Sequence, residues 1–172
     1  DVSPIEGFFT YFSSSKNITT YVQSYGNGTY SVSNFNLNPL IDLYCSNAVY
    51  YSGWNIIVVY EDLTLPNTQL NIYNGFRYVG NENFFSYNFL VDGLNIIDTA
   101  NAKMSTISWN GSPNQYFGES ILLNNNTLSN AQNPADNPFN STNNFTGSST
   151  NWNQDIDLFD IYENENQLGA DK

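Results

Sequence analysis

Histidine is absent from this 172-residue chain, and cysteine occurs only at Cys45. Without histidine there is no Ser-His-Asp or Cys-His catalytic group, no imidazole metal ligand and no side chain that ordinarily titrates near pH 7. A single cysteine cannot form an intrachain disulfide. Because no second thiol lies near Cys45, we interpret it as a small buried apolar residue. These absences disfavour the common nucleophilic enzymes, and we expect no enzymatic activity.

Basic residues are also scarce. Four Lys and Arg face sixteen Asp and Glu, which gives a formal net charge of −12 and a pI near 4.1. Phosphate backbones and anionic membrane faces repel such a chain, so nucleic-acid binding is disfavoured. Charged residues make up only 12% of the sequence. The surface must therefore be covered by neutral polar side chains, chiefly the 30 Asn, a composition typical of secreted β-proteins.

Long apolar runs are missing as well. No segment approaches the roughly 20 apolar residues that cross a bilayer. Residues 1–5 lack the basic and apolar regions of a signal peptide. We therefore expect a mature or excised piece of an extracellular protein, without direct membrane insertion.

Short β-type segments, separated by Asn, Gly and Ser, dominate what is present. One short helix is expected at residues 17–25, with Asn17 as its cap and apolar residues at helical spacing. Residues 54–60 (WNIIVVY) suit a strand buried on both faces. The pattern predicts an all-β sandwich or jelly-roll in one domain, residues 1–162, followed by a polar tail, residues 163–172. The other expected strands are residues 5–12, 28–35, 69–73, 76–79, 84–90, 103–109, 120–123 and 155–161.

Residues 124–153 differ from the rest because they are rich in Asn, Ser, Thr and Pro and poor in aliphatic side chains. We expect a long irregular loop there. The strand after it (DIDLFDI) is expected to turn Ile156, Leu158, Phe159 and Ile161 inward, with one break in the alternation.

Residues 53–79, GWNIIVVYEDLTLPNTQLNIYNGFRYV, resemble a signature of large surface proteins of Bacteroidota and some archaea. Its elements are Gly-Trp, a hydrophobic stretch ending in Val-Val-Tyr-Glu-Asp, then Leu-Pro and Tyr-x-Gly-Phe. Residues 17–34, 119–140 and 154–161 also resemble that family, so the likeness covers most of the chain. It implies a β-domain of gliding-motility and cell-surface adhesins exported by the type IX secretion system.

Two departures from the family pattern bear on the fold. Leu63 stands where the family commonly has proline, which affects the turn. The family pattern also has strands before the helix and at least one after the acidic segment. We therefore expect outer strands that are absent, or that come from another segment or another chain, since an unpaired sheet edge seeks a partner.

Acidic residues near the end of the chain are the candidate metal ligands. Asp155 and Asp157 share a face at strand spacing, and Asp136 lies in the preceding loop. With Asn and carbonyl oxygens they suit a hard cation such as Ca²⁺, although no EF-hand spacing is present. The alternative interpretation is a solvated acidic strand face.

A second acidic pair, Glu61 and Asp62, follows the most apolar segment. Adjacent strand residues point to opposite faces, so the two do not form a glycosidase pair. We interpret them as a solvated strand end or a turn cap; calcium or an ion pair with Arg77 is the alternative.

Trp109 and Trp152 are the candidate sugar-stacking residues, with packing in the protein as the alternative for each. Asp98-Thr99-Ala100 resembles the short O-glycosylation motif of Bacteroidota, with Thr99 as the acceptor. The sequence thus favours a non-enzymatic structural or adhesive module of a bacterial cell-surface protein, with neighbouring domains or subunits as partners. The alternative is a carbohydrate-binding sandwich for surface glycans, with or without calcium.

Overall fold

The computed structural model describes residues 2–4, 10–36, 52–80, 85–94, 101–114 and 118–161, and the described chain is mostly non-helical with a few short strands. It divides into two compact units, one comprising Asp1–Pro39 and Asn67–Gly93, the other Leu40–Pro66 and Leu94–Lys172. Cys45, Thr99 and the polar tail lie outside the described residues, so the predictions made for them stay predictions.

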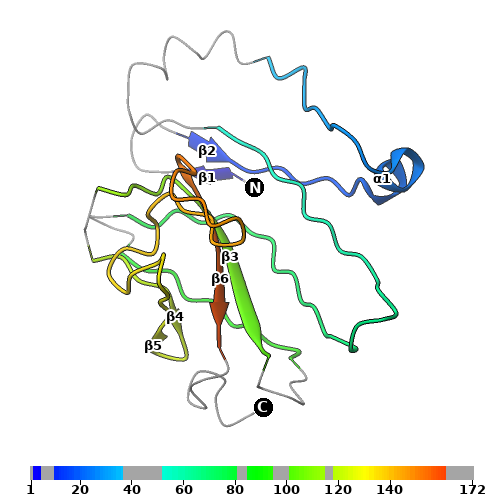
Figure 1. Ribbon diagram of the computed structural model, residues 1–172. Helices are drawn as coiled ribbons and strands as arrows, with labels where there is room; N and C mark the ends of the chain where they lie inside the picture. The colour runs from blue at the N-terminus through cyan, green and yellow to red at the C-terminus, as the bar shows by residue number, and fades with distance from the viewer. Residues whose placement is uncertain are drawn as a thin grey trace. The chain divides into compact units, whose positions relative to one another are not determined.

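The second unit is built on two antiparallel strands, β3 (Lys103–Trp109) and β6 (Gln154–Asp160), drawn side by side in Figure 1. Both match segments that the sequence predicts as strands. Their register places Ser108 opposite Asp155, Thr106 opposite Asp157 and Met104 opposite Phe159. Because opposite residues of an antiparallel pair project to the same side, these residues share one face of the pair. This is the buried face of β6.

The same unit contains a tight hairpin of β4 (Leu122–Leu123) and β5 (Asn126–Thr127). Its two turn residues, Asn124 and Asn125, both have positive φ, at 48° and 67°. A two-residue turn with this geometry matches the twist of the flanking strands, and Asn tolerates it better than most residues. Part of the asparagine content of the chain therefore serves backbone geometry.

A small apolar core lies at one end of the buried face of β6. Leu128, Phe159 and Ile161 are buried, with 1%, 1% and 7% of their surface exposed. Partly buried side chains pack against them: Ala102 just before β3, Met104 in β3, Ile121 just before β4 and Leu123 in β4. Towards the other end of the same face the buried side chains of β6 are Asp157 and Asp155. One strand face thus carries both an apolar and a polar interior.

The first unit holds β1 (Val2–Pro4), β2 (Thr10–Phe12) and α1 (Thr19–Tyr25). The first two pair antiparallel. The helix itself confirms the prediction, but its N-cap residue is Ile18, without a side-chain cap, and not Asn17. Asn17 Oδ1 accepts a hydrogen bond from the Thr19 backbone N–H at 2.9 Å just before the helix. With seven residues, α1 is far too short to cross a bilayer, and no longer apolar helix occurs in the described part of the chain.

Several predicted strands are not formed. Residues 28–35, 69–73 and 76–79, and the described part of 84–90, make no strand ladder. The expectation of a doubly buried strand at residues 54–60 is wrong: Val58 is 62% exposed and Tyr60 75%. Their β-branched and aromatic composition fits a pleated surface, but a strand also needs a hydrogen-bonded neighbour, which composition does not supply.

Candidate functional site

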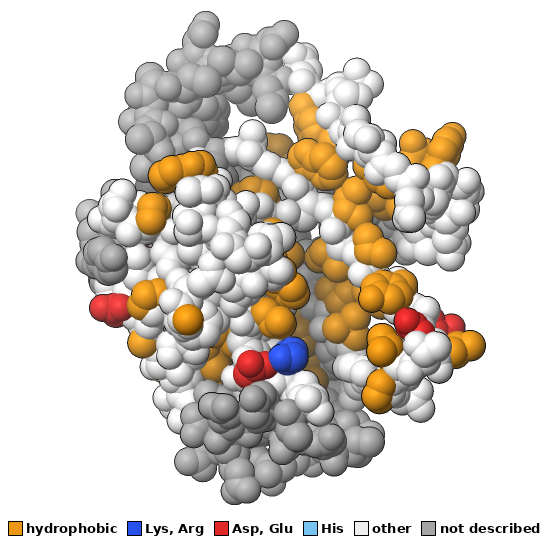
Figure 2. Space-filling view, viewed as in Figure 1, with side chains coloured by type: hydrophobic (Ala, Val, Ile, Leu, Met, Phe, Trp, Pro, Cys, Tyr) orange, Lys and Arg blue, Asp and Glu red, His pale blue; other side chains and the backbone are white. Residues whose placement is uncertain are grey.

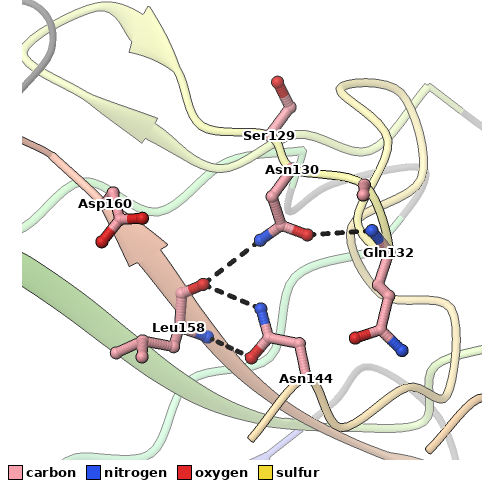
Figure 3. Close-up of a pocket in the computed structure, with 7 residues that line it drawn as sticks. Ser129, Asn130, Gln132, Asn144, Leu158 and Asp160 are labelled. Carbon is pink, nitrogen blue, oxygen red and sulfur yellow. Dashed lines mark hydrogen bonds between the residues drawn. The ribbon is translucent and has the colours of Figure 1, made fainter. Parts of the chain in front are cut away.

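The long Asn-rich loop covers the edge of β6 that faces away from β3. Thr142 O accepts a hydrogen bond from the Ile156 N–H at 3.1 Å, and the Asn144 N–H donates to Ile156 O at 3.2 Å. One residue pair further along, the Asn144 side chain continues the ladder. Its Oδ1 accepts from the Leu158 N–H at 2.8 Å and its Nδ2 donates to Leu158 O at 2.8 Å (Figure 3). A side-chain amide here takes the place of a neighbouring peptide group.

Asn130 adds a second side chain to the same edge. Its Nδ2 donates to Leu158 O at 3.2 Å, and its Oδ1 accepts from the backbone N–H of Gln132 at 3.0 Å (Figure 3). These side chains line a shallow pocket of ≈ 390 Å³ with Ser129, Ala131 and Asp160. Because the Asn130 and Asn144 amide groups are engaged with backbone, we assign this pocket to edge protection, which keeps a strand from pairing with another chain.

Replacing Asn144 with Ala is expected to lower the free energy of unfolding by about 1–3 kcal/mol, because it strands the Leu158 N–H without its acceptor. The Asn144→Asp variant keeps that acceptor but replaces the donor with a carboxylate oxygen that faces Leu158 O, so we expect it to lose stability as well. Urea denaturation of both variants measures the difference. Equal stability of the Ala variant and the wild type would show that the edge needs no side-chain partner.

Polar side chains of this loop and of β6 fill the space between the loop and the strand pair. The buried polar residues are Asn133, Asn137, Asn140, Ser141, Thr142, Asp155 and Asp157, and both aspartates are 0% exposed. The interpretation of Asp155 and Asp157 as a solvated acidic face is therefore wrong. The expected inward set of β6 is correct for Phe159 and Ile161 but wrong for Ile156 and Leu158, which are only half-buried while the aspartates lie inside.

Asp155 is held by the backbone of the loop. Its Oδ1 accepts a hydrogen bond from the Thr142 N–H at 3.1 Å. Ser141 has a positive φ of 64°, and a left-handed residue among successive N–H groups forms an anion-binding concavity. Burial raises the pKa of Asp155 to about 6, and the N–H groups of Thr142, Ser141 and Asn140 oppose that rise. A methyl group on Gly111 would lie 1.9 Å from Asp155 Oδ2, so only glycine fits there.

The carboxylate of Asp157 is less well supported by hydrogen bonds than that of Asp155. Burial raises its pKa to about 7, with the neighbouring charge of Asp155 as the second cause. The side chains of Asn133 and Thr142 lower this pKa, but neither reaches hydrogen-bond geometry with the carboxylate. The Thr142 hydroxyl donates instead to Asn133 Oδ1 at 2.8 Å. Two carboxylates two residues apart on one face are thus buried side by side, with a shared electrostatic cost.

Oxygen atoms without a hydrogen-bond partner gather on this face. Among the described residues, Asp155 Oδ2 and both Asp157 carboxylate oxygens have no partner. Neither do the buried hydroxyls of Thr106 and Ser108, which stand directly across the strand pair from them. Buried polar groups are almost always hydrogen-bonded. This concentration of unpaired oxygens therefore marks the face as the candidate site.

No family model, curated protein or solved structure matches this chain.

The structure separates the other candidate residues. Asp136 is exposed, and its neighbour Asn137 is the buried residue of that stretch. No group of three or more His, Cys, Asp or Glu side chains gathers within the described ranges. The further oxygens near Asp155 and Asp157 are therefore neutral ones. Sequence reasoning missed Thr106 and Ser108, although a β3–β6 register would have found them.

Trp109 and Trp152 differ in their surroundings. The Trp109 ring packs on Gly53, where a methyl group would lie 2.2 Å from its Cζ3 atom, whereas Trp152 is 67% exposed. Trp109 thus has a packing role, and of the two candidates it is Trp152 that presents its ring to solvent. Asp62 caps a turn, since its Oδ1 accepts from the Thr64 N–H at 2.9 Å and from the Thr64 hydroxyl at 2.7 Å. These bonds hold its pKa below the usual value.

Proposed function

We propose that the chain is a non-enzymatic structural or adhesive module of a large extracellular cell-surface protein, and that its complete fold is a β-sandwich. The observation that carries the proposal is the exposed apolar surface of residues 54–65. Large apolar side chains there are between 50% and 89% exposed, namely Trp54, Ile57, Val58, Val59, Tyr60, Leu63 and Leu65. Hydrophobic side chains are also widespread over the face drawn in Figure 2.

An exposed apolar stretch of this length is costly for a free-standing protein, and it usually marks a surface that another chain or domain covers. The loop already closes the edge of β6, so a partner would not add a strand there. The partners that fit are neighbouring domains or subunits of the same surface protein, which would cover the apolar stretch. The acidic, histidine-free composition agrees with a role in which the module holds and presents a surface. The resemblance to gliding-motility and surface adhesins supports the same function.

The test is the association state of the purified 172-residue chain. We expect sedimentation to show concentration-dependent self-association, accompanied by binding of a hydrophobic dye. Val58→Lys should weaken both, because it places a charge within the apolar stretch. Val32→Lys is the matched control, since Val32 is also exposed (46%) but lies outside that stretch. A monomer that binds no dye at any concentration would remove the basis of the assembly role.

A glycan array run on the same protein separates the alternative, a carbohydrate-binding module. The exposure of Trp152 is the feature that favours this alternative, because an accessible indole ring can stack on a sugar. Selective glycan binding that disappears in Trp152→Ala would replace the structural role by a lectin-like one. A blank array together with self-association supports the proposal as stated.

A further inference from the structure

The polar half of the covered face holds several buried oxygen atoms that have no hydrogen-bond partner in the described chain. Asp155 Oδ2, the two Asp157 oxygens and the Thr106 and Ser108 hydroxyl oxygens are all buried and unpaired within the described chain. In the β3–β6 register they form two adjacent cross-strand rows, Ser108 with Asp155 and Thr106 with Asp157. Successive same-face residues on a strand are about 6–7 Å apart, so side chains of adjacent rows can converge on a point between them.

Two buried amide side chains of the Asn-rich loop are also incompletely hydrogen-bonded. Asn133, which is 0% exposed, has its Nδ2 near Asp157 but without a hydrogen-bond partner, and its Oδ1 accepts from Thr142. Asn140 Oδ1 is also buried and unpaired, although its Nδ2 donates to Gln132 O at 2.7 Å. The backbone of Asn140 is one of the groups that face the Asp155 carboxylate. Of the two unpaired amide atoms, Asn140 Oδ1 is a neutral oxygen of the kind that calcium binds, whereas Asn133 Nδ2 is a donor that can only hydrogen-bond to an acceptor such as Asp157.

Nothing basic in the described chain neutralises the two buried acids. The ion pair that the structure shows joins Lys103 to Asp160, and both of those side chains are about half exposed. Protonation supplies at most one hydrogen-bond donor for each carboxyl group. It does not change the positions of the unpaired oxygen atoms, none of which lies in hydrogen-bond geometry with a partner in the described chain. A hard cation instead contacts several oxygens at once and cancels the charge.

We propose that Asp155 and Asp157, with the hydroxyls of Ser108 and Thr106 across the strand pair, bind one calcium ion between the two strands and the Asn-rich loop. Calcium accepts six to eight oxygens, carboxylate and neutral, in flexible geometry. Magnesium requires a smaller, near-octahedral shell and retains water, which fits a closed face less well. The inference is independent of the proposed function: a cation that joins loop to strands stabilises either kind of module.

The test uses the full 172-residue chain, freed of metal with a chelator and then titrated with calcium chloride in a calorimeter. We expect one calcium ion per chain and a thermal midpoint raised by about 5–10 °C at calcium near 100 times Kd. Asp157→Asn should abolish both effects. Asp160→Asn is the matched control, because Asp160 lies on the exposed face of the same strand and should leave calcium binding unchanged.

Three results would overturn the inference. The first is no heat of binding and no change in the thermal midpoint of the wild-type chain. The second is the same calcium response in Asp157→Asn as in Asp160→Asn, which would place the cation elsewhere on the acidic surface. The third is equal stabilisation by magnesium, which would exclude a calcium-type site. If Asp157→Asn does not fold, Ser108→Ala removes a single neutral ligand and is expected to weaken calcium binding several-fold.

Discussion

Replacing Phe159 with Ala is expected to lower the free energy of unfolding by about 3–5 kcal/mol, as for other buried phenylalanines. Its ring is 1% exposed and belongs to the small apolar core that it forms with Leu128 and Ile161 in the described part of the chain. In so small a core, Leu128 and Ile161 have few neighbours with which to close the cavity. The loss would then be a large part of the 5–15 kcal/mol that stabilises a typical domain.

Phe145→Ala is the control for this measurement. Phe145 is of the same residue type, lies in the Asn-rich loop and is 56% exposed. Its removal should change the free energy of unfolding by less than about 1 kcal/mol, as expected for an exposed side chain away from special features. Urea denaturation followed by circular dichroism compares the two variants. A similar loss in both would mean that the β3–β6 face does not hold the main core of this unit.

The sequence predicted both long strands as short β-type segments, and for residues 155–161 also from their alternation. It did not correctly predict which face of β6 is buried. In a regular strand every second residue faces the same side, so Asp155, Asp157, Phe159 and Ile161 share one face. An inward set that contains both Ile156 and Phe159 breaks this rule. The parity rule alone would have placed the aspartates inside. What hid this result was the expectation that carboxylates lie outside, which fails where a polar loop covers the strand.

The exposed segment 54–65 shows the opposite failure. Its apolar, β-branched residues predict a buried strand, yet they carry no information on which chain pairs with it. The sequence also could not predict that the Asn-rich loop covers the edge of β6. Asn144 acts as a ladder partner only because the chain returns beside Leu158, and a composition rich in Asn does not reveal that position. Local patterns therefore found elements, while pairings across many residues remained undetermined.

In the presence of a chelator, the stability of the wild-type chain is expected to fall by several kcal/mol as the pH rises from about 4 to about 8, at about 1.4 kcal/mol per pKa unit. In the folded chain the pKa of Asp155 is raised from 3.8 to about 6, and that of Asp157 to about 7. The unfolded chain releases both protons near pH 4. Between pH 4 and 7 the folded state therefore binds more protons than the unfolded state, and the free energy of unfolding decreases with pH. This is opposite to the behaviour of a salt-bridged aspartate, whose stabilising effect grows as pH rises.

Asp157→Asn is the variant that isolates this effect. It removes the more strongly perturbed carboxyl and relieves the repulsion that raises the pKa of its neighbour. In chelator at pH 8 we expect it to be more stable than the wild type, with a flatter dependence on pH, whereas Asp160→Asn should follow the wild-type curve. Denaturant unfolding at pH 4.5, 6 and 8 gives the three curves. Stability that increases with pH in the chelated wild type would mean that the two aspartates are paired or solvated. Their burial against Asn133, Thr142 and the loop backbone predicts the reverse slope.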